Sequence, residues 1–207
     1  MYARTTTVRG DPRAVDDGIA FARNEVWPRL ERMDGCVGMS MLADREAGRC
    51  IVTAAWTTED AMRASADEVR ELRRQLDEVL RAESVEIAEW EIAVLHRFRP
   101  PGEGACVRAI WSDVPAGRVD GMVDAFRMGL LPRLDDLPGF CSVSLLVDRG
   151  SLRAVAAVTY ADRAAMERAR QQGAALREEF SAAMGSTITE VAEFDLALAH
   201  LRVPEMA

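Results

Sequence analysis

An internal repeat constrains this sequence more than any other feature, because the second half repeats the first at a constant shift of 104 residues. Residues 2–98 align with residues 106–202 almost without gaps. Matching segments include Trp27-Pro28-Arg29-Leu30 with Leu131-Pro132-Arg133-Leu134, and Glu86-Ile87-Ala88-Glu89-Trp90 with Glu190-Val191-Ala192-Glu193-Phe194. One register held over this length indicates a duplication. A fold assigned to one copy therefore applies to both.

The two copies are separated by a short segment rich in proline and glycine, Arg99-Pro100-Pro101-Gly102-Glu103-Gly104. Because this composition interrupts helices and strands alike, the segment is predicted to be a linker. A chain of 207 residues with 49% hydrophobic content can supply cores for two small domains. We therefore expect a first module at residues 1–98, a linker at 99–104 and a second module at 105–207.

The residue pattern of each copy predicts the order strand, helix, strand, strand, helix, strand. Asp11 is the expected N-cap of the first helix and Pro12 its first residue. Pro28 and Pro132 lie near the expected ends of the two first helices, where a missing N–H and a ring clash should kink or stop each helix. Apolar residues at three- and four-residue steps predict the buried faces of these helices: Val15, Ile19, Ala22, Val26 and Leu30, and Val119, Val123, Phe126, Leu130 and Leu134.

Two short β runs at residues 36–43 and 50–56, joined by a polar turn, predict a hairpin. The second helix is expected to start after Thr57 or Thr58, and the last strand is expected at residues 85–96. The second helix and its repeat are expected to bury Met62, Val69, Leu72, Leu76, Val79 and Leu80, and Met166, Leu176, Phe180, Ala183 and Met184.

The predicted strands are apolar on both faces and need cover on both sides. The two helices of one βαββαβ module can cover one face of its sheet, and the bare second face would seek a partner. The sister copy can supply that partner, so we predict an α+β fold in which two ferredoxin-like modules form one pseudo-twofold barrel with four helices outside. Because the duplication internalises a dimer, we expect a monomer or a dimer of pseudo-dimers.

Composition narrows the range of partners. The formal net charge is −8 and the charges are scattered along the helices, which disfavours nucleic acid as a partner. No apolar run reaches the roughly 18 residues of a membrane span, and the N-terminal segment lacks the apolar stretch of a signal peptide. We therefore expect no membrane association and a cytoplasmic location.

Three local patterns resemble a known group of proteins. The first helix ends in Pro-Arg-Leu, Leu137-Pro138-Gly139-Phe140 leads into a strand, and a strand ending Ala55-Trp56-Thr57 directly precedes a helix that begins Glu59-Asp60-Ala61-Met62. These patterns resemble the antibiotic-biosynthesis-monooxygenase-like domains of the dimeric α+β barrel superfamily, here as a tandem fusion. The resemblance implies a small-molecule pocket in each half, between helices and sheet. Its members include cofactor-independent quinone-forming monooxygenases and haem-degrading enzymes.

Several catalytic and cofactor motifs are absent from the sequence. The resemblance implies that a haem-degrading enzyme would carry an axial histidine on the helix after Trp56, and neither copy has one there. No phosphate-binding glycine loop, HExxH, GxSxG or Cys/His cluster occurs. We expect no cofactor and no metal site. Cys36, Cys50, Cys106 and Cys141 lie in apolar runs without CxxC spacing, which favours buried free thiols over metal ligands or disulfides.

The two histidines, His96 and His200, occupy the same repeat position and are the candidate catalytic residues. An unperturbed imidazole titrates near neutral pH, which suits acid–base catalysis. In the other interpretation both histidines only form hydrogen bonds to a chain terminus or to the linker at the end of a last strand.

Two arginines and four aromatic residues are the candidate substrate-binding residues. Arg4 and Arg108 lie in the first strands, where a buried guanidinium needs either an anionic ligand or a carboxylate; the candidate carboxylates are Glu86, Glu89, Glu190 and Glu193. The aromatic candidates either contact a ligand or fill the core: Trp27, Trp56, Trp90 and Tyr160, with Trp56 and Tyr160 expected at the pocket mouths. The copies differ at Trp27 and Leu131, Asn24 and Met128, Trp90 and Phe194, and Thr7 and Trp111, which suggests that only one half kept a working pocket.

Three classes of function remain open. The first is a protein that binds a small hydrophobic or aromatic molecule and acts as a cofactor-independent oxygenase or isomerase on an aromatic or polyketide-like compound. The second is a non-catalytic ligand-binding or stress-response module that kept only the fold. The third is a scaffold, which the charged outer faces of the helices disfavour. Whether the chain is an enzyme stays open at this stage.

Overall fold

The computed structural model describes residues 1–201, and the remaining residues of the predicted second module, 202–207, lie outside the described part. The chain divides into two compact units. The first contains Met1–Glu91 and the end of the last strand from Asp195, and the second contains Ile92–Phe194. The final strand of each copy therefore begins in one unit and ends in the other.

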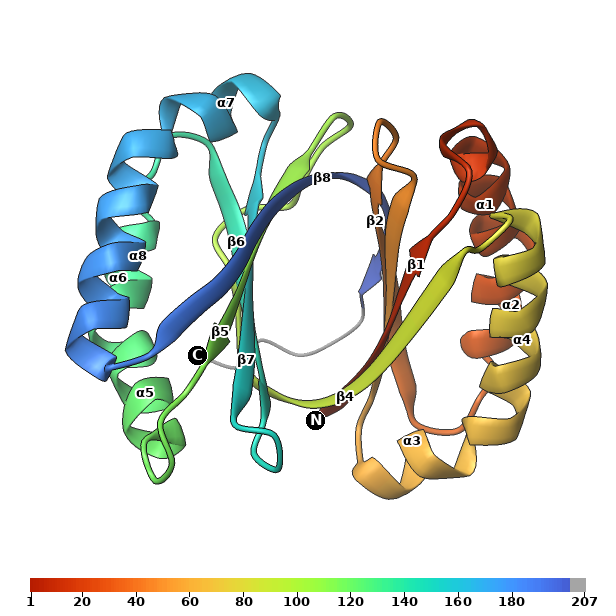
Figure 1. The fold of residues 1–207 in the computed structure, drawn as a ribbon, viewed down its shortest axis with the longest axis horizontal. Helices are drawn as coiled ribbons and strands as arrows, with labels where there is room; N and C mark the ends of the chain where they lie inside the picture. Colours follow the sequence, from red (N-terminus) through yellow and green to blue (C-terminus); the bar gives the residue numbers. More distant parts are fainter. Residues whose placement is uncertain (202–207) are drawn as a thin grey trace. The chain divides into compact units, whose positions relative to one another are not determined.

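The first copy follows the predicted order of elements (Figure 1). Its strands are β1 (Tyr2–Arg9), β2 (Cys36–Asp44), β3 (Arg49–Trp56) and β4 (Ser84–Arg97). Its first helical segment consists of η1 (Pro12–Ala14), α1 (Val15–Phe21), η2 (Ala22–Val26) and α2 (Trp27–Leu30), and its second of α3 (Glu59–Ala64) and α4 (Ala66–Val79).

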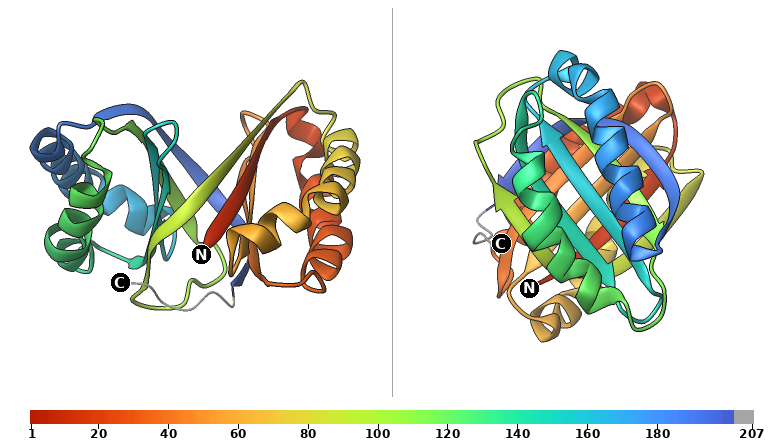
Figure 2. Two further views of the ribbon diagram at one scale, coloured as in Figure 1. Left: turned by 90° about the horizontal axis from the view of Figure 1, so that it is seen from below. Right: turned by 90° about the vertical axis from the view of Figure 1, so that its left-hand side faces the viewer.

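The second copy repeats this order. Its strands are β5 (Cys106–Asp113), β6 (Phe140–Asp148), β7 (Arg153–Tyr160) and β8 (Thr187–Leu201). Its helical segments are α5 (Val119–Ala125), η3 (Phe126–Leu130) and α6 (Leu131–Leu134), then α7 (Arg163–Arg168) and α8 (Arg170–Met184). The right-hand view of Figure 2 shows the helices of this unit lying across one face of its strands.

The fold is α+β with an antiparallel eight-stranded sheet, as predicted. Strand β1 pairs with β3 on one side and with β4 on the other, and β2 pairs with β3 and with the end of β8. The hydrogen-bonded order is β1-β3-β2-β8-β5-β7-β6-β4, a closed barrel. The register of β5 on β7 repeats that of β1 on β3, because Arg4 faces Ala54 and Arg108 faces Val158.

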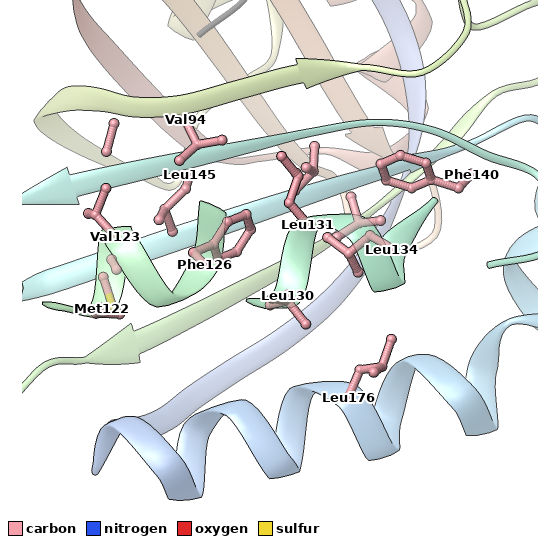
Figure 3. Close-up of a cluster of buried hydrophobic side chains, with 14 of the residues drawn as sticks. Val94, Met122, Val123, Phe126, Leu130, Leu131, Leu134, Phe140, Leu145 and Leu176 are labelled. Carbon is pink, nitrogen blue, oxygen red and sulfur yellow. The ribbon is translucent and has the colours of Figure 1, made fainter. Parts of the chain in front are cut away.

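Each unit has its own hydrophobic core between helices and sheet. In the first unit the core includes Val15, Val26 and Leu72. In the second it includes Phe126, Leu130 and Leu176, and Figure 3 shows the Leu176 side chain on α8 pointing toward the helix that carries Phe126 and Leu130. Four positions are less buried than predicted: Ala183 is exposed, and Val79, Phe180 and Met184 are half-buried.

The first helices end at Leu30 and Leu134, shortly after their prolines, as the sequence predicted, but the turn that precedes each proline was not foreseen. Five residues of π-helix precede each proline-containing turn, at η2 and η3. The Trp27 N–H bonds to the carbonyl of Ala22, five residues back. The wider turn accommodates a proline that offers no N–H and whose ring would clash in a regular α-helix.

The predicted second helix is two helices in each copy. The Thr58 hydroxyl accepts a hydrogen bond from the Ala61 N–H and caps α3, and the Asp162 carboxylate does the same for α7 through Ala165. Ser65 and Ala169 separate the short helix from the long one. Among the described residues, no helix has the length and apolar character needed to span a membrane.

Candidate functional site

Each unit contains a cavity between its helices and its sheet. The cavity of the second unit has a volume of about 80 Å³ and that of the first about 30 Å³. Every residue that lines the smaller cavity has its counterpart, 104 residues later, in the lining of the larger one. The smaller lining is Arg4, Thr6, Val26, Leu30, Val52, Ala54, Trp56, Val69, Leu72, Arg73 and Leu76. The two cavities are thus one ancestral site that is open to different extents.

Substitutions between the copies account for the difference in volume. Val69 is buried in the first unit, whereas its counterpart Gly173 has no side chain to fill the same space. A Cβ atom at Gly173 would lie 3.7 Å from both Nη1 of Arg108 and the Tyr160 hydroxyl, so the space beside the glycine borders both polar groups. The missing side chain enlarges the cavity next to its polar groups.

A second exchange between the copies lies where the end of α4 packs against α1. A Cβ atom at Gly18 would lie 2.3 Å from Cδ2 of Leu80, which shows how closely Leu80 packs over that glycine. The counterparts in the second unit are Met122 and Met184, and Met122 lines the cavity instead. The two cavities differ, as the sequence suggested, but none of the four exchanged pairs on which that expectation was based lines either cavity.

The two strand arginines form the same ion pair in both units. Arg4 and Glu89 are directly opposed on β1 and β4, and Nε and Nη2 of Arg4 donate to Oε1 of Glu89 at 2.9 and 2.7 Å. Arg108 donates in the same way to Glu193 at 3.1 and 2.8 Å. Each Nη2 also donates to a helix carbonyl, that of Met62 or Met166. Of the two predicted partners for a buried arginine, an anionic ligand or a carboxylate, the structure shows a carboxylate in each unit: Glu89 for Arg4 and Glu193 for Arg108.

The remaining nitrogen of each guanidinium is buried without a hydrogen-bond acceptor in the described part of the chain. This atom is Nη1 in both Arg4 and Arg108. The guanidinium carbon lies 5.5 Å from the Trp56 ring centroid in the first unit and 5.6 Å from that of Tyr160 in the second. The aromatic ring supports the cation from one side, but it does not accept the hydrogen bond that Nη1 can still donate.

Trp56 and Tyr160 line the two cavities from within. They are 0% and 1% exposed, so they do not lie at pocket mouths as predicted. Burial raises the pKa of the Tyr160 hydroxyl, although the charge of Arg108 opposes this shift. At neutral pH the cavity therefore contains a neutral hydroxyl beside a cationic guanidinium.

The other two tryptophan candidates lie outside both cavity linings. The Trp27 ring stacks on His200, with ring centroids 4.8 Å apart and planes 7° from parallel. The Trp90 indole donates to the Thr5 hydroxyl at 2.9 Å. In the described structure these two residues serve strand and helix packing.

The two histidines occupy different environments despite their equivalent sequence positions. Nε2 of His96 lies 3.0 Å from Oδ1 of Asp135, while His200 stacks on Trp27. Neither histidine is part of the two cavity linings. Each lies in the unit formed mainly by the opposite copy, because the last strands cross between units.

The four cysteines are free thiols, as the sequence favoured. Three are buried and Cys36 is half-buried. Burial raises the pKa of the Cys50 thiol to about 11, so it stays protonated at neutral pH. Within residues 1–201, no three His, Cys, Asp or Glu side chains are grouped so that they could hold a metal ion.

Comparison with known proteins places the chain in a family. No family model matches the sequence. The Uncharacterized protein Rv2557 of Mycobacterium tuberculosis is 47% identical over 206 residues, covering 100% of this chain and 92% of the relative. Uncharacterized protein Rv2558 of the same organism is 46% identical over 207 residues, covering 100% and 87%. This chain belongs to their family.

Solved structures establish the fold of the family. An anthrone oxidase-like protein superposes with a TM-score of 0.68 at 12% identity, covering 100% of this chain and 95% of that chain. A monooxygenase-like protein from Listeria innocua gives 0.56 at 7% identity, covering 94% and 93%. A ferredoxin-fold protein related to antibiotic biosynthesis monooxygenases, from Listeria monocytogenes, gives 0.54 at 9%, covering 94% and 94%. This family member therefore has the antibiotic-biosynthesis-monooxygenase-like fold, as two fused modules.

Several lining residues were not identified from the sequence. Arg177, Phe180 and Ser181 on α8 and Phe126 on η3 all face the larger cavity. The exchange of Val69 for Gly173 was visible in the alignment of the copies and was the best available signal. A glycine in the middle of a helix lowers its stability by about 1 kcal/mol relative to alanine, which would have marked the position as unusual.

The second helix of each unit places an arginine in the cavity lining, Arg73 in the first and Arg177 in the second. In the first unit, burial lowers the pKa of Arg73, and the carboxylate of Asp77, one turn along α4, opposes that shift. Oδ1 of Asp77 is itself buried without a hydrogen-bond donor among residues 1–201. In the second unit the counterpart of Asp77 is Ser181. Burial also lowers the pKa of Arg177, and the nearby charge of Arg108 lowers it further.

Proposed function

We propose that this chain binds a small, mainly apolar molecule in the cavity of the second unit. The proposal rests on a cavity of about 80 Å³ with mainly apolar walls. One nitrogen of a buried guanidinium in this lining, Nη1 of Arg108, has no hydrogen-bond acceptor among the described residues. A single water needs about 10–15 Å³, so the space exceeds what one water fills. Apolar walls with a few convergent polar groups are typical of small-molecule sites.

The polar groups of the cavity favour binding over catalysis. The lining contains two arginines, a neutral tyrosine and three serines, with no histidine or carboxylate among them. Such a set can orient a ligand and stabilise negative charge on an oxygen. It offers no general base within the lining, because arginine stays protonated.

The first experiment is a thermal-unfolding screen against aromatic polyketides, quinols, flavins, haem and fatty acids. A ligand at about 100 times its Kd should add roughly 2.7 kcal/mol to the free energy of unfolding. The variant Gly173→Val introduces the residue of the first copy and should abolish the shift. Gly121→Val is the matched control, because Gly121 is exposed on α5 and an added Cβ would meet no atom within 4 Å.

The two variants separate binding in the cavity from binding elsewhere. A stabilising ligand that is lost with Gly173→Val and kept with Gly121→Val supports the proposal. A ligand that stabilises both variants equally binds outside the cavity and contradicts it. A screen without any shift also contradicts it.

A second candidate function is a cofactor-independent oxygenase or isomerase acting on an aromatic or polyketide-like ligand. It is supported by the fold, which is shared with proteins described as anthrone oxidase-like and monooxygenase-like. An oxygenase of this type would take O₂ as oxidant and convert a CH₂ group to C=O, with one water as the second product. The cationic lining would stabilise a substrate anion formed on the way.

The base for such a reaction would have to come from outside the described lining, and His96 and His200 are the candidates kept for it. His96→Gln, His200→Gln and the double variant should be compared in an oxygen-consumption assay with any ligand from the screen. A loss of turnover with unchanged ligand affinity would support a histidine base. Unchanged turnover in the double variant would remove histidine from the mechanism.

A further inference from the structure

Neither cavity lining contains a carboxylate, but a carboxylate stands beside the lining residue Arg73 on α4 at a position where α8 has none. Asp77 follows Arg73 by one helical turn in the first unit, whereas Ser181 stands at this place in the second and lines the cavity. The hydroxyl of Ser181 donates to the Ser186 carbonyl at 2.6 Å, so it is already used within the protein. The second unit therefore keeps both lining arginines, Arg108 and Arg177, without a carboxylate at the position of Asp77, and the carboxylate that acts on Arg177 is that of the exposed Glu178.

The carboxylate that pairs with Arg108 has more arginines around it than its counterpart in the first unit. Glu193 lies 3.4 Å from Arg170 and 3.9 Å from Arg163, in addition to its pair with Arg108. In the first copy the residues at those two positions are Ala66 and Glu59. Glu193 thus faces three arginines, of which Arg170 also pairs with Glu167 at 2.6 Å, whereas the ion pair of Glu89 is with Arg4.

The balance of acidic and basic side chains over the whole second helical segment also differs between the two copies. Residues 59–80 contain seven acidic and four basic side chains, whereas residues 163–184 contain three acidic and four basic ones. The side of the larger cavity formed by α7 and α8 therefore carries a positive surplus. Positive potential at a cavity with low-dielectric walls attracts anions.

Arg108 supplies the group that would bind such an anion. Its side chain is 4% exposed, and Nη1 remains without an acceptor among the described residues. Nη1 borders the space left open by Gly173, on the same side as the Tyr160 hydroxyl. Leaving a buried charged donor unpaired costs free energy, which a ligand oxygen at this place would recover. Nη1 of Arg4 is equally unpaired, but Val69 occupies the corresponding space.

We infer that the larger cavity binds a small carboxylic acid as its anion, with the carboxylate between Arg108 and Arg177 and the apolar body against Phe126, Leu130, Leu176 and Phe180. The ligand would supply in the second unit the carboxylate that Asp77 supplies in the first. This inference rests on the proposed function and names the chemical class of its ligand.

The test compares acids with neutral molecules of the same shape. Binding of phenylacetate, cinnamate and octanoate is measured by calorimetry beside that of their primary amides. A charge-assisted pair should make each acid that binds at least about tenfold tighter than its amide. The variant Ser181→Asp restores the carboxylate of the first copy and should remove this preference. Ser181→Asn has the same shape without the charge and should keep it.

A second pair of variants covers the case in which Ser181→Asp does not fold. Arg177→Gln should weaken acid binding by about tenfold and leave amide binding unchanged. Arg168→Gln removes an exposed arginine of the preceding helix and should change neither. Equal loss in both arginine variants would indicate a general charge effect and would overturn the inference.

The outcomes distinguish this inference from the proposed function. Acids and amides that bind equally well, with binding abolished by Gly173→Val, would overturn the acid inference and leave the proposed function in place. A full acid preference retained in Ser181→Asp would also overturn the inference. Absence of binding by every compound of this set and of the earlier screen would overturn both.

Discussion

The two units descend from one sequence, and their cavities show how few substitutions separate a filled core from an open site. In the first unit, the Val69 side chain takes up space between helix and sheet, and Asp77 lies near Arg73. In the second, Gly173 and Ser181 stand at the positions of Val69 and Asp77 and line the larger cavity. The same scaffold thus holds a nearly filled core in one unit and an open cavity in the other.

The largest expected effect concerns the ion pairs. Removing the carboxylate with Glu193→Gln should destabilise the protein by about 3 kcal/mol, because an almost fully buried Arg108 loses its partner. Glu89→Gln should cost less, because the Glu89 side chain is 46% exposed and that of Glu193 is 23% exposed. Urea unfolding of both variants measures the difference. A larger effect for Glu89→Gln would contradict the view that the second pair is the more buried one.

The next effect concerns the side chain that fills the smaller cavity. Val69→Gly should destabilise by about 2–3 kcal/mol, combining the lost burial of valine with the cost of glycine in a helix. Val69→Ala separates the two contributions, because alanine keeps the helix propensity. Urea unfolding gives the free energies. If Val69→Ala has no effect, Val69 does not fill the cavity in solution.

The reciprocal change in the second unit should be stabilising. Gly173→Ala replaces a glycine inside α8 and should add about 0.5–1 kcal/mol. The new Cβ would make ordinary contacts at 3.7 Å with Arg108 and Tyr160. Gly121→Ala in α5 is the control for helix propensity alone, and thermal unfolding compares the two. A clear loss of stability at position 173 would show that the space is occupied by the protein itself.

The smallest effect concerns the start of the first helix. Hydrogen bonds from Arg13 lower the pKa of Asp11 from 3.8 to about 2, whereas the second copy has Pro115 at this position. A depressed pKa means that Asp11 stabilises the fold above pH 3.8 and loses this effect as the pH falls through about 2. Asp11→Asn should therefore melt below wild type at pH 5.

The pH dependence provides the check on that prediction. The difference in melting temperature between wild type and Asp11→Asn should shrink between pH 4 and pH 2, in the window given by the two pKa values of Asp11. A difference that stays constant over this range would show that the charge of Asp11 does not contribute.

The sequence predicted the fold well because a duplication is a long-range signal that local errors do not disturb. The order of elements, the hairpins and the helix starts followed from patterns of a few residues. The π turns before Pro28 and Pro132 did not, since a proline pattern alone does not show whether a helix breaks or widens. The sequence also identified Arg4 and Arg108 but offered four glutamates as partners. The register of β4 on β1 selected Glu89 for Arg4.

The sequence alone was enough to identify a duplicated α+β protein with two strand arginines and to show where the two copies differ. Which of these differences change the cavities became apparent from the packing of the folded chain. His200 meets Trp27, 173 positions away in the chain, because β8 ends beside β2. The volume of a cavity is what remains after all neighbouring side chains have packed, so the effect of Gly173 depends on Arg108, Tyr160 and Phe180 together. A periodic sequence pattern involves residues that are close in the chain, whereas packing brings together residues that are far apart in it. The lining of the cavity could therefore be identified only from the folded structure.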